Sequence, residues 1–419
     1  SSDVCSSDLE IISTGGTAAL LQRAGLPVTP IELVTGVPEM LGGRVKTLHP
    51  KVHGGLLARR HVSQDEYDLH QHGIVKIELL VVNLYPFAET IAREGVSLEE
   101  AIEQIDIGGV ALLRAAAKNH RDVTVLSDPA DYGAVLGELR AQRQVSPATR
   151  QRLAVRAFEA TAAYDRLIAD YLGAQMGEQE ERFPERLSIA ATRAGVLRYG
   201  ENPHQQAALY RRAGAGGLAH AEQVHGKGMS YTNWLDAEGA WQSVLAFDGP
   251  AIVIVKHASP CGIATNRDLG RAWADALASD PISAFGGVVA INRPVNLDLA
   301  RAIDEIFTEI ILAPAFEPEA LAQLRQKANR RLLQVPALRG PDDEVRAIPG
   351  GFVVQERDQP EAVPAFQDVG KRPASEEEWA ALQFAWRAVV GVKSNAIVLA
   401  RAMPGGFATV GIGTETGDV

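Results

Sequence analysis

Short apolar segments alternate with amphipathic ones along most of this 419-residue chain, and that alternation limits the fold more than any other feature. The apolar runs are too short to span a membrane and are typical of buried strands. The clearest of them are residues 78–83, 123–126, 251–255, 288–291 and 309–312. Helical patterns lie between them, and the longest covers residues 147–172. Strands that alternate with helices in this way predict an α/β fold with parallel sheets covered by helices.

Composition excludes several classes of protein. Acidic residues outnumber basic ones by 52 to 41, and the resulting formal charge of -11 argues against broad contact with nucleic-acid phosphates. Aromatic residues make up 6% of the chain, too few for stacking on single-stranded nucleic acid. Cys5 and Cys261 provide no disulfide framework, and the N-terminus lacks the features of a secretory signal. We therefore expect a soluble cytoplasmic protein that binds neither nucleic acid nor membrane.

A polar, charged segment at residues 177–184 ends in proline and predicts a domain boundary. We expect one domain over residues 10–180 and a second over residues 186–414. Residues 1–9 differ in character from the chain that follows, and we predict that they are a non-native leader.

The first candidate site is a Ser-Thr-Gly-Gly-Thr motif between an apolar run and a helical pattern. Its residues are Ser13, Thr14, Gly15, Gly16 and Thr17. The motif would place free backbone N–H groups at a helix N-terminus, which favours an anion. A plain strand-to-helix turn that needs glycine dihedrals explains it equally well.

The second candidate is the loop at residues 44–55, which combines three cations, two imidazoles and a hydroxyl. This set favours a phosphate or carboxylate ligand, and a solvated basic loop is the alternative. His49 and His53 have the spacing of a metal-binding pair. We expect Pro50 to interrupt the helix that such a pair requires, so we predict no metal there.

Further candidates follow predicted strands in the first half. Asn83 and Tyr85 come at the carboxyl end of a strand, where open α/β sheets bind ligands. Asp106 precedes a Gly-Gly break and a predicted helix over residues 110–118, and Lys118 ends that helix. The two groups can face one crevice, although a lysine in a last helical turn is favourable wherever it occurs.

In the second half, Lys256 and His257 directly follow a strand apolar enough to be buried on both faces. An amine beside an imidazole suits acid–base chemistry, and we expect the following Pro-Cys-Gly to form a turn that exposes both side chains. A snorkelling lysine beside a hydrogen-bonded core histidine is the alternative. The segment also resembles a zinc-deaminase motif, but Ser259 stands in place of the glutamate and Ala264 in place of the second cysteine.

Eight motifs, in this order, resemble the bifunctional purine-biosynthesis family that joins AICAR transformylase to IMP cyclohydrolase. They are Ser-Thr-Gly-Gly-Thr, Gly-Arg-Val-Lys-Thr-Leu-His-Pro-Lys-Val-His-Gly-Gly, Asn-Leu-Tyr-Pro-Phe, Ile-Asp-Ile-Gly-Gly, Ala-Ala-Lys-Asn-His, Arg-Tyr-Gly-Glu-Asn-Pro-His-Gln, Val-Lys-His-Ala-Ser-Pro-Cys-Gly and Ser-Ala-Phe-Gly-Gly. The resemblance implies a methylglyoxal-synthase-like α/β domain followed by cytidine-deaminase-like α/β subdomains without zinc, in a homodimer. It also implies the last two steps to IMP, with 10-formyltetrahydrofolate as co-substrate.

The resemblance also implies roles for individual residues. In formyl transfer, His257 would take the amine proton of AICAR and Lys256 would stabilise charge on the formyl oxygen. The residues implied to hold AICAR are Arg198, Tyr199, Gly286, Glu309 and Asn395. In ring closure, Lys118 would donate and accept protons, with Asp106, Tyr85 and Lys46 around the reacting centre. The residues implied to bind the nucleotide are Ser13, Thr14, Gly15, Gly16, Arg44, Val45, Thr47, Val82, Asn83 and Ile107.

The chain departs from the family pattern at both ends. Residues 1–9 lack the family's Ser-x-Ser-Asp-Lys motif, and residues 415–419 stand where a Gln-x-Ser-Arg segment and a folate-binding region would follow. We therefore expect the first strand and helix to be missing, and an incomplete transformylase domain that cannot complete formyl transfer. Two alternatives stay open: a non-catalytic nucleotide-binding module and a zinc-dependent nucleoside deaminase.

Overall fold

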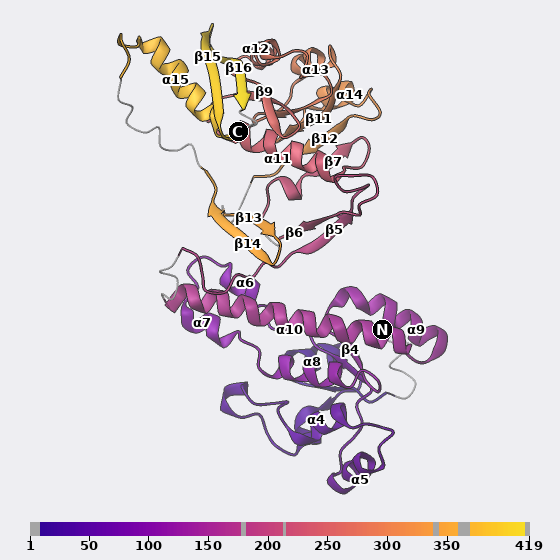
Figure 1. Cartoon of the computed structure of the whole chain (residues 1–419). Helices are drawn as coiled ribbons and strands as arrows, with labels where there is room; N and C mark the ends of the chain where they lie inside the picture. The colour runs from indigo at the N-terminus through magenta and orange to yellow at the C-terminus, as the bar shows by residue number, and fades with distance from the viewer. Residues whose placement is uncertain (1–8, 177–181, 213–214, 338–342, 359–368, 415–419) are drawn as a thin grey trace. The chain divides into compact units, whose positions relative to one another are not determined.

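The computed structural model describes residues 9–176, 182–212, 215–337, 343–358 and 369–414. The chain divides into two compact units, Ser1–Ser188 and Ile189–Val419 (Figure 1). The predicted leader, except for Leu9, and the first five residues of the predicted boundary segment lie outside the described residues. None of the helices in the described part of the chain is both long enough and apolar enough to cross a membrane.

Unit 1 combines short parallel strand pairs with many helices. Strand β1 (Ile12–Ser13) pairs with β2 (Thr29–Pro30), and β3 (Leu79–Val81) pairs with β4 (Thr124–Leu126). The helical elements are α2 (Gly15–Arg23), α3 (Ile31–Thr35), η1 (Leu41–Gly43), α4 (Pro50–Leu57), α5 (Ser63–His72), α6 (Phe87–Ile91), α7 (Leu98–Glu103), α8 (Gly108–Lys118), η2 (Pro129–Asp131), α9 (Tyr132–Gln142) and α10 (Pro147–Met176). The predicted strands and the predicted long helix are confirmed.

The core of unit 1 lies where α8, β4 and α10 pack together. Leu113 and Ala116 of α8 are fully buried, and Leu153 and Ala157 of α10 are 1% exposed in the same apolar cluster. Small alanine side chains allow the two helices to approach closely. The packing of α8 fixes the positions of the polar groups at its two ends.

The predicted interruption at Pro50 is wrong, because α4 begins there. A proline at the first helical position loses no hydrogen bond, since that N–H would have no partner within the helix. His49 caps the same helix, and its Nδ1 accepts the backbone N–H of Lys51 at 3.1 Å.

The predicted Gly-Gly break before α8 is wrong as well, because the helix begins at Gly108. The Oδ1 atom of Asp106 accepts the N–H of Gly109 at 2.7 Å. A Cβ atom on Gly109 would lie 2.3 Å from Oδ2 of the same carboxylate. Glycine therefore lets Asp106 bind the first turn of the helix.

Unit 2 is built around an eight-stranded sheet in the order β15-β16-β9-β8-β10-β11-β12-β7. Its strands are β7 (Glu222–His225), β8 (Ala251–Lys256), β9 (Ser259–Asn266), β10 (Gly287–Ile291), β11 (Thr308–Ala313), β12 (Arg331–Gln334), β15 (Ala396–Met403) and β16 (Gly406–Thr414). Neighbours among β10, β11 and β12 are parallel, and the other neighbouring pairs are antiparallel. The predicted parallel sheet is thus a mixed sheet in this unit.

Helices cover both faces of this sheet. The helical elements of unit 2 are η3 (Leu218–His220), α11 (Tyr231–Leu245), α12 (Leu269–Ser279), α13 (Leu297–Asp304), α14 (Pro318–Leu324) and α15 (Glu376–Val389). Two separate antiparallel hairpins complete the unit, β5 (Thr192–Val196) with β6 (Ala208–Arg211) and β13 (Asp343–Ile348) with β14 (Gly351–Glu356). Strand β16 is paired on both sides, with β15 and with β9.

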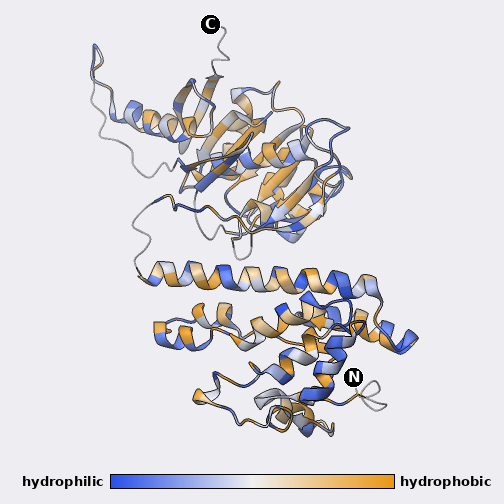
Figure 2. Cartoon of the chain, turned by 60° about the horizontal axis from the view of Figure 1, so that its bottom comes forward, coloured by the Kyte–Doolittle hydropathy of each residue, from blue (hydrophilic) through white to orange (hydrophobic). Residues whose placement is uncertain are grey.

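The central strand β8 is buried on both faces. Val253 and Val255 belong to the core that includes α11 and α15, whereas Ile252 and Ile254 belong to the core that includes α12, α13 and α14. Burial on both faces explains why the strand is apolar without interruption. Figure 2 shows the hydrophobic colour concentrated in the strands of this sheet.

Close packing of α12 against β9 provides a test of this arrangement. A Cβ atom on Gly262 would lie 2.0 Å from the carbonyl oxygen of Ala276, whereas one on Gly413 would meet no atom within 4 Å. We expect Gly262→Ala to lower the free energy of unfolding by about 2 kcal/mol, because overpacking forces the strand and helix apart. Gly413→Ala, the matched control, should change it by less than about 0.5 kcal/mol.

Urea unfolding followed by tryptophan fluorescence measures this difference, since all five tryptophans of the chain lie in unit 2. Equal destabilisation by the two substitutions would contradict the packing described.

Candidate functional site

One edge of the eight-stranded sheet gathers the candidate residues of the second half. Strand β8 runs antiparallel to β10, and β10 is parallel to β11, so the end of β8 meets the starts of both strands. Lys256 ends β8 and His257 follows it. Gly286 directly precedes β10, and Glu309 is the second residue of β11. The antiparallel order β9-β16-β15 brings the start of β15, and with it Asn395, to the same edge.

His257 and Ala258 form a two-residue turn between β8 and β9. Their φ angles are +53° and +59°, in the left-handed region that residues other than glycine rarely adopt. His257 is exposed and Lys256 is half-buried. The expectation of a turn at Pro-Cys-Gly is wrong, because residues 260–262 lie within β9. The hairpin turn itself exposes the imidazole.

Hydrogen bonds connect this turn to its neighbours. The Lys256 Nζ atom donates to the carbonyl oxygens of Phe285 and Gly286, each at 3.1 Å. The backbone N–H of Ala258 donates to Oδ1 of Asp236 on α11 at 2.8 Å. Burial raises the pKa of the Asp236 carboxyl above its ordinary value. The sequence does not single out Asp236, because an acid in the middle of an amphipathic helix has no distinguishing pattern.

A second set of contacts extends the site to Arg198. The Oε1 atom of Glu309 accepts a hydrogen bond from Nη1 of Arg331 at 2.8 Å. Arg331 Nε donates to the carbonyl oxygen of Gly228 at 3.3 Å, and Arg198 Nη1 donates to the same oxygen at 3.5 Å. The guanidinium of Arg198 also lies 5.1 Å from the ring centroid of Tyr199. Arg331 begins a short strand and belongs to no motif, so the sequence alone does not single it out.

In unit 1, a cavity of about 860 Å³ runs along α8. Asp106 and Ile107 line it at the start of the helix, and Lys118 lines it at the end. The predicted crevice shared by Asp106 and Lys118 is therefore present. Other residues that line it are His53, Leu57, Ile105, Val110, Ala111, Arg114, Ala115, His120, Phe158, Asp165 and Ile168. The spacing of Arg114 and Lys118, one helical turn apart, was the signal that could have identified Arg114.

A tyrosine from α10 holds the segment before α8 in place. The Tyr164 hydroxyl donates to the carbonyl oxygen of Gln104 at 2.8 Å and accepts the N–H of Asp106 at 2.9 Å. Burial is the main cause that raises the pKa of Tyr164, and the nearby Asp106, Asp165 and Tyr85 raise it further. The candidate residue Tyr85 is thus close to Tyr164.

The loop that contains Arg44, Lys46 and Thr47 lies beside the end of α7 and the start of α8. A Cβ atom on Gly108 would come within 2.8 Å of Oγ1 of Thr47. Arg44 forms an ion pair with Glu103, at the end of α7. The Nζ atom of Lys46 lies 3.1 Å from a carboxylate oxygen of Glu39.

The remaining candidates of unit 1 do not line the cavity along α8. Residues 13–16 span the end of β1 and the start of α2, where Thr14 is the N-cap residue and Gly15 has a φ of +49°. Asn83 follows β3, and its Oδ1 atom accepts the Tyr132 hydroxyl at 3.2 Å. Val45 and Val82 are likewise absent from the lining of this cavity.

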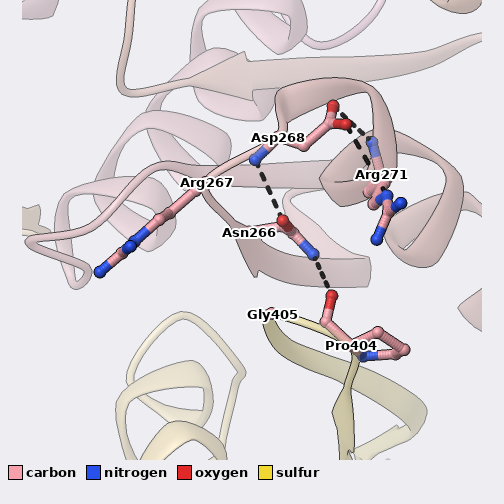
Figure 3. Close-up of a pocket in the computed structure, with 6 residues that line it drawn as sticks. All are labelled: Asn266, Arg267, Asp268, Arg271, Pro404 and Gly405. Carbon is pink, nitrogen blue, oxygen red and sulfur yellow. Dashed lines mark hydrogen bonds and ion pairs between the residues drawn. The ribbon is translucent and has the colours of Figure 1, made fainter.

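A second cavity, of about 500 Å³, lies at the opposite edge of the sheet in unit 2 (Figure 3). The Asn266 side chain bridges this region, since its Nδ2 donates to the Pro404 carbonyl and its Oδ1 accepts the N–H of Asp268, each at 3.0 Å. The remaining residues of the lining are Arg267, Arg271 and Gly405. None of the candidate site residues belongs to it.

Metal binding receives no support within the described ranges of the chain. They contain no group of three or more His, Cys, Asp or Glu side chains placed to hold a metal ion. Cys261, the cysteine of the deaminase-like motif, is half-buried in β9, and burial raises its pKa to about 11.

Two family models together cover most of the chain. Residues 116–416 match the model described as the AICARFT/IMPCHase bienzyme, and residues 3–111 match the MGS-like domain. The chain belongs to the AICARFT/IMPCHase bienzyme family. The predicted α/β fold class, with an MGS-like N-terminal domain, is thereby confirmed, and so is the predicted function in the last two steps of de novo purine biosynthesis.

Individual relatives of this family are similar over nearly the whole chain. A "Bifunctional purine biosynthesis protein PurH" from Chloroflexus aurantiacus is 53% identical over 398 residues, which cover 94% of this chain and 76% of the relative. The protein of the same name from Bacillus subtilis is 48% identical over 414 residues, which cover 97% of this chain and 79% of the relative.

His53 provides a test of the cavity in unit 1. Its Nε2 atom is buried and, within the described structure, has no hydrogen-bond partner, and burial lowers the pKa of the imidazole below the usual value of 6.5. The unfolded chain then binds a proton more readily than the folded chain. Stability should therefore fall as the pH drops from about 6.5 through the folded pKa. We expect His53→Gln to reduce this decline, as measured by urea unfolding at several pH values between 7.5 and 5. An unchanged pH dependence would contradict a buried, neutral imidazole.

Proposed function

We propose that the sheet edge around Lys256 and His257 transfers a formyl group to AICAR, and that the cavity along α8 serves the ring closure that gives IMP. Family membership supports AICAR and IMP as the nucleotides and a folate-type formyl donor, which we propose is 10-formyltetrahydrofolate. The observation that carries the first assignment is the exposed imidazole beside an amine, at the edge where the other candidate residues converge.

The formyl transfer that we propose needs a base and an electrophilic group. The amine nitrogen of AICAR attacks the formyl carbon while the imidazole of His257 takes the amine proton. Lys256 stabilises negative charge on the formyl oxygen and assists release of the folate, whose nitrogen regains a proton as its bond to the formyl carbon breaks. Arg198 and Tyr199 hold AICAR, with Gly286, Glu309 and Asn395.

In the ring closure that we propose, the carboxamide nitrogen of formyl-AICAR attacks the formyl carbon and water is lost. Lys118 donates and accepts the protons. Asp106 precedes α8 and Lys118 ends it, and both groups line the same cavity. Lys46 and Tyr85 complete this reacting centre, and residues 13–16, 44–47, 82–83 and 107 bind the nucleotide.

The remaining proposals concern the whole protein. We propose that it is a cytoplasmic homodimer, with an IMP cyclohydrolase domain over residues 10–180 and an AICAR formyltransferase domain over residues 186–414. Two alternatives compete with this proposal: a non-catalytic nucleotide-binding module and a zinc-dependent nucleoside deaminase. The following experiments distinguish the proposal from both.

The first experiment removes the proposed proton donor of ring closure. Lys118 is exposed, so Lys118→Met should leave folding intact while it lowers the rate of IMP formation from formyl-AICAR by at least about 100-fold. Lys76→Met is the matched control. It makes the same substitution at a lysine that does not line the cavity and that forms an ion pair with Glu66 on α5 instead. Unchanged rates in both variants would support a non-catalytic module.

The second experiment removes the proposed base of formyl transfer. Its reference is the parent chain, whose measurable turnover would itself contradict the expectation of an incomplete transformylase domain. His257→Asn suits this purpose because asparagine tolerates the left-handed backbone of the turn. We expect formyl transfer to AICAR to fall by at least about 100-fold, with the Kd for AICAR from calorimetry changed by less than about threefold. Deaminase activity that depends on added zinc would instead favour the competing enzyme class.

A further inference from the structure

The turn that carries His257 is held in an unfavourable backbone conformation by a neighbouring helix. Both central residues, His257 and Ala258, have left-handed φ angles although neither is glycine. Such a conformation persists only where surrounding contacts fix it. The contacts that act on this turn come from α11.

Two residues of α11 meet the turn. Oδ1 of Asp236 accepts the N–H of Ala258 at 2.8 Å. One turn further along the helix, a Cβ atom on Gly239 would lie 3.1 Å from the Ala258 carbonyl oxygen and 3.4 Å from its Cα. The absence of a side chain at Gly239 lets the helix approach the turn closely enough for Asp236 to reach the backbone.

Charged groups surround the Asp236 carboxylate. The charges of His257 in the turn and Lys256 at the end of β8 lower its pKa, and that of Glu309 on β11 raises it. Glu309 is in turn bonded to Arg331 of β12 at 2.8 Å. The same carboxylate therefore contacts the turn that carries His257 and directly follows Lys256, and it interacts electrostatically with Glu309, a residue proposed to bind AICAR.

We propose that Asp236 is a positioning residue for formyl transfer: its hydrogen bond to the Ala258 N–H fixes the turn and so aims His257 and Lys256 at the substrate. This inference rests on the proposed role of His257. Asp236 acts here as a hydrogen-bond acceptor and does not itself touch the reacting atoms. The neutral amide of asparagine can supply the same acceptor oxygen, whereas alanine cannot.

Three variants test this proposal. Asp236→Ala should lower kcat for formyl transfer by at least about tenfold, with KM for AICAR changed by less than about threefold. Asp236→Asn should retain at least about a third of the kcat, because it keeps the acceptor. Adding Ala258→Gly to Asp236→Ala should recover much of the loss, since glycine adopts the left-handed conformation without the anchor.

A readout without turnover accompanies these rates. The Ala258 amide should be protected from hydrogen exchange in the parent protein and in Asp236→Asn, and should lose that protection in Asp236→Ala. An unprotected Ala258 amide in the parent, or an Asp236→Ala variant with parental kcat, would overturn the inference. If His257→Asn were also without effect, the proposed function itself would fail. If His257→Asn removed activity while Asp236→Ala did not, only the positioning role would fail.

Discussion

Burial of β8 on both faces of one sheet determines where the polar groups of unit 2 can lie. A strand covered by helices on either side has no place for a charge along its length, since an unpaired buried charge is strongly unfavourable. Polar residues are therefore confined to the strand ends, and Lys256 is the first charged residue after five fully buried apolar ones. The candidate chemistry of this unit follows from that exclusion.

Strand direction then decides which polar residues meet. Gly286, Glu309 and Arg331 are separated in the sequence, yet the register of the sheet brings the starts of β10, β11 and β12 to the edge where β8 ends. A single β8–β9 hairpin with a two-residue turn places His257 at that same edge. The site is thus a property of the sheet edge rather than of one loop.

In unit 1, a helix rather than a sheet edge brings the candidate polar groups together. Packing of α8 against α10 leaves one side of the helix open, and the polar groups on that side line a cavity with Asp106 at one end and Lys118 at the other. An 11-residue helix is about 16 Å long, so the backbone positions of the two groups lie at opposite ends of it. Two hydrogen bonds hold Asp106 in place. Its backbone N–H donates to the Tyr164 hydroxyl, and its Oδ1 atom accepts the N–H of Gly109.

Much of the fold could be predicted because its signals are local. The apolar run of β8, the capping boxes at Ser97 and Ser375 and the length of α10 all follow from neighbouring residues in the sequence. The start of α4 at Pro50 and of α8 at Gly108 could not be predicted with the same rules, because proline and glycine are breakers inside a helix but are tolerated in its first turn.

The sequence by itself determined the α/β class, the strands and the motifs that identify the family, since these depend on residue type and spacing. Only the tertiary structure decided that Asp236 and Arg331 belong to the site, that His257 lies in a left-handed turn, and that the sheet of unit 2 is mixed. The physical reason is that these features depend on strand order and helix packing between residues far apart in the chain. No local pattern encodes such contacts, because they form only when the strands have paired.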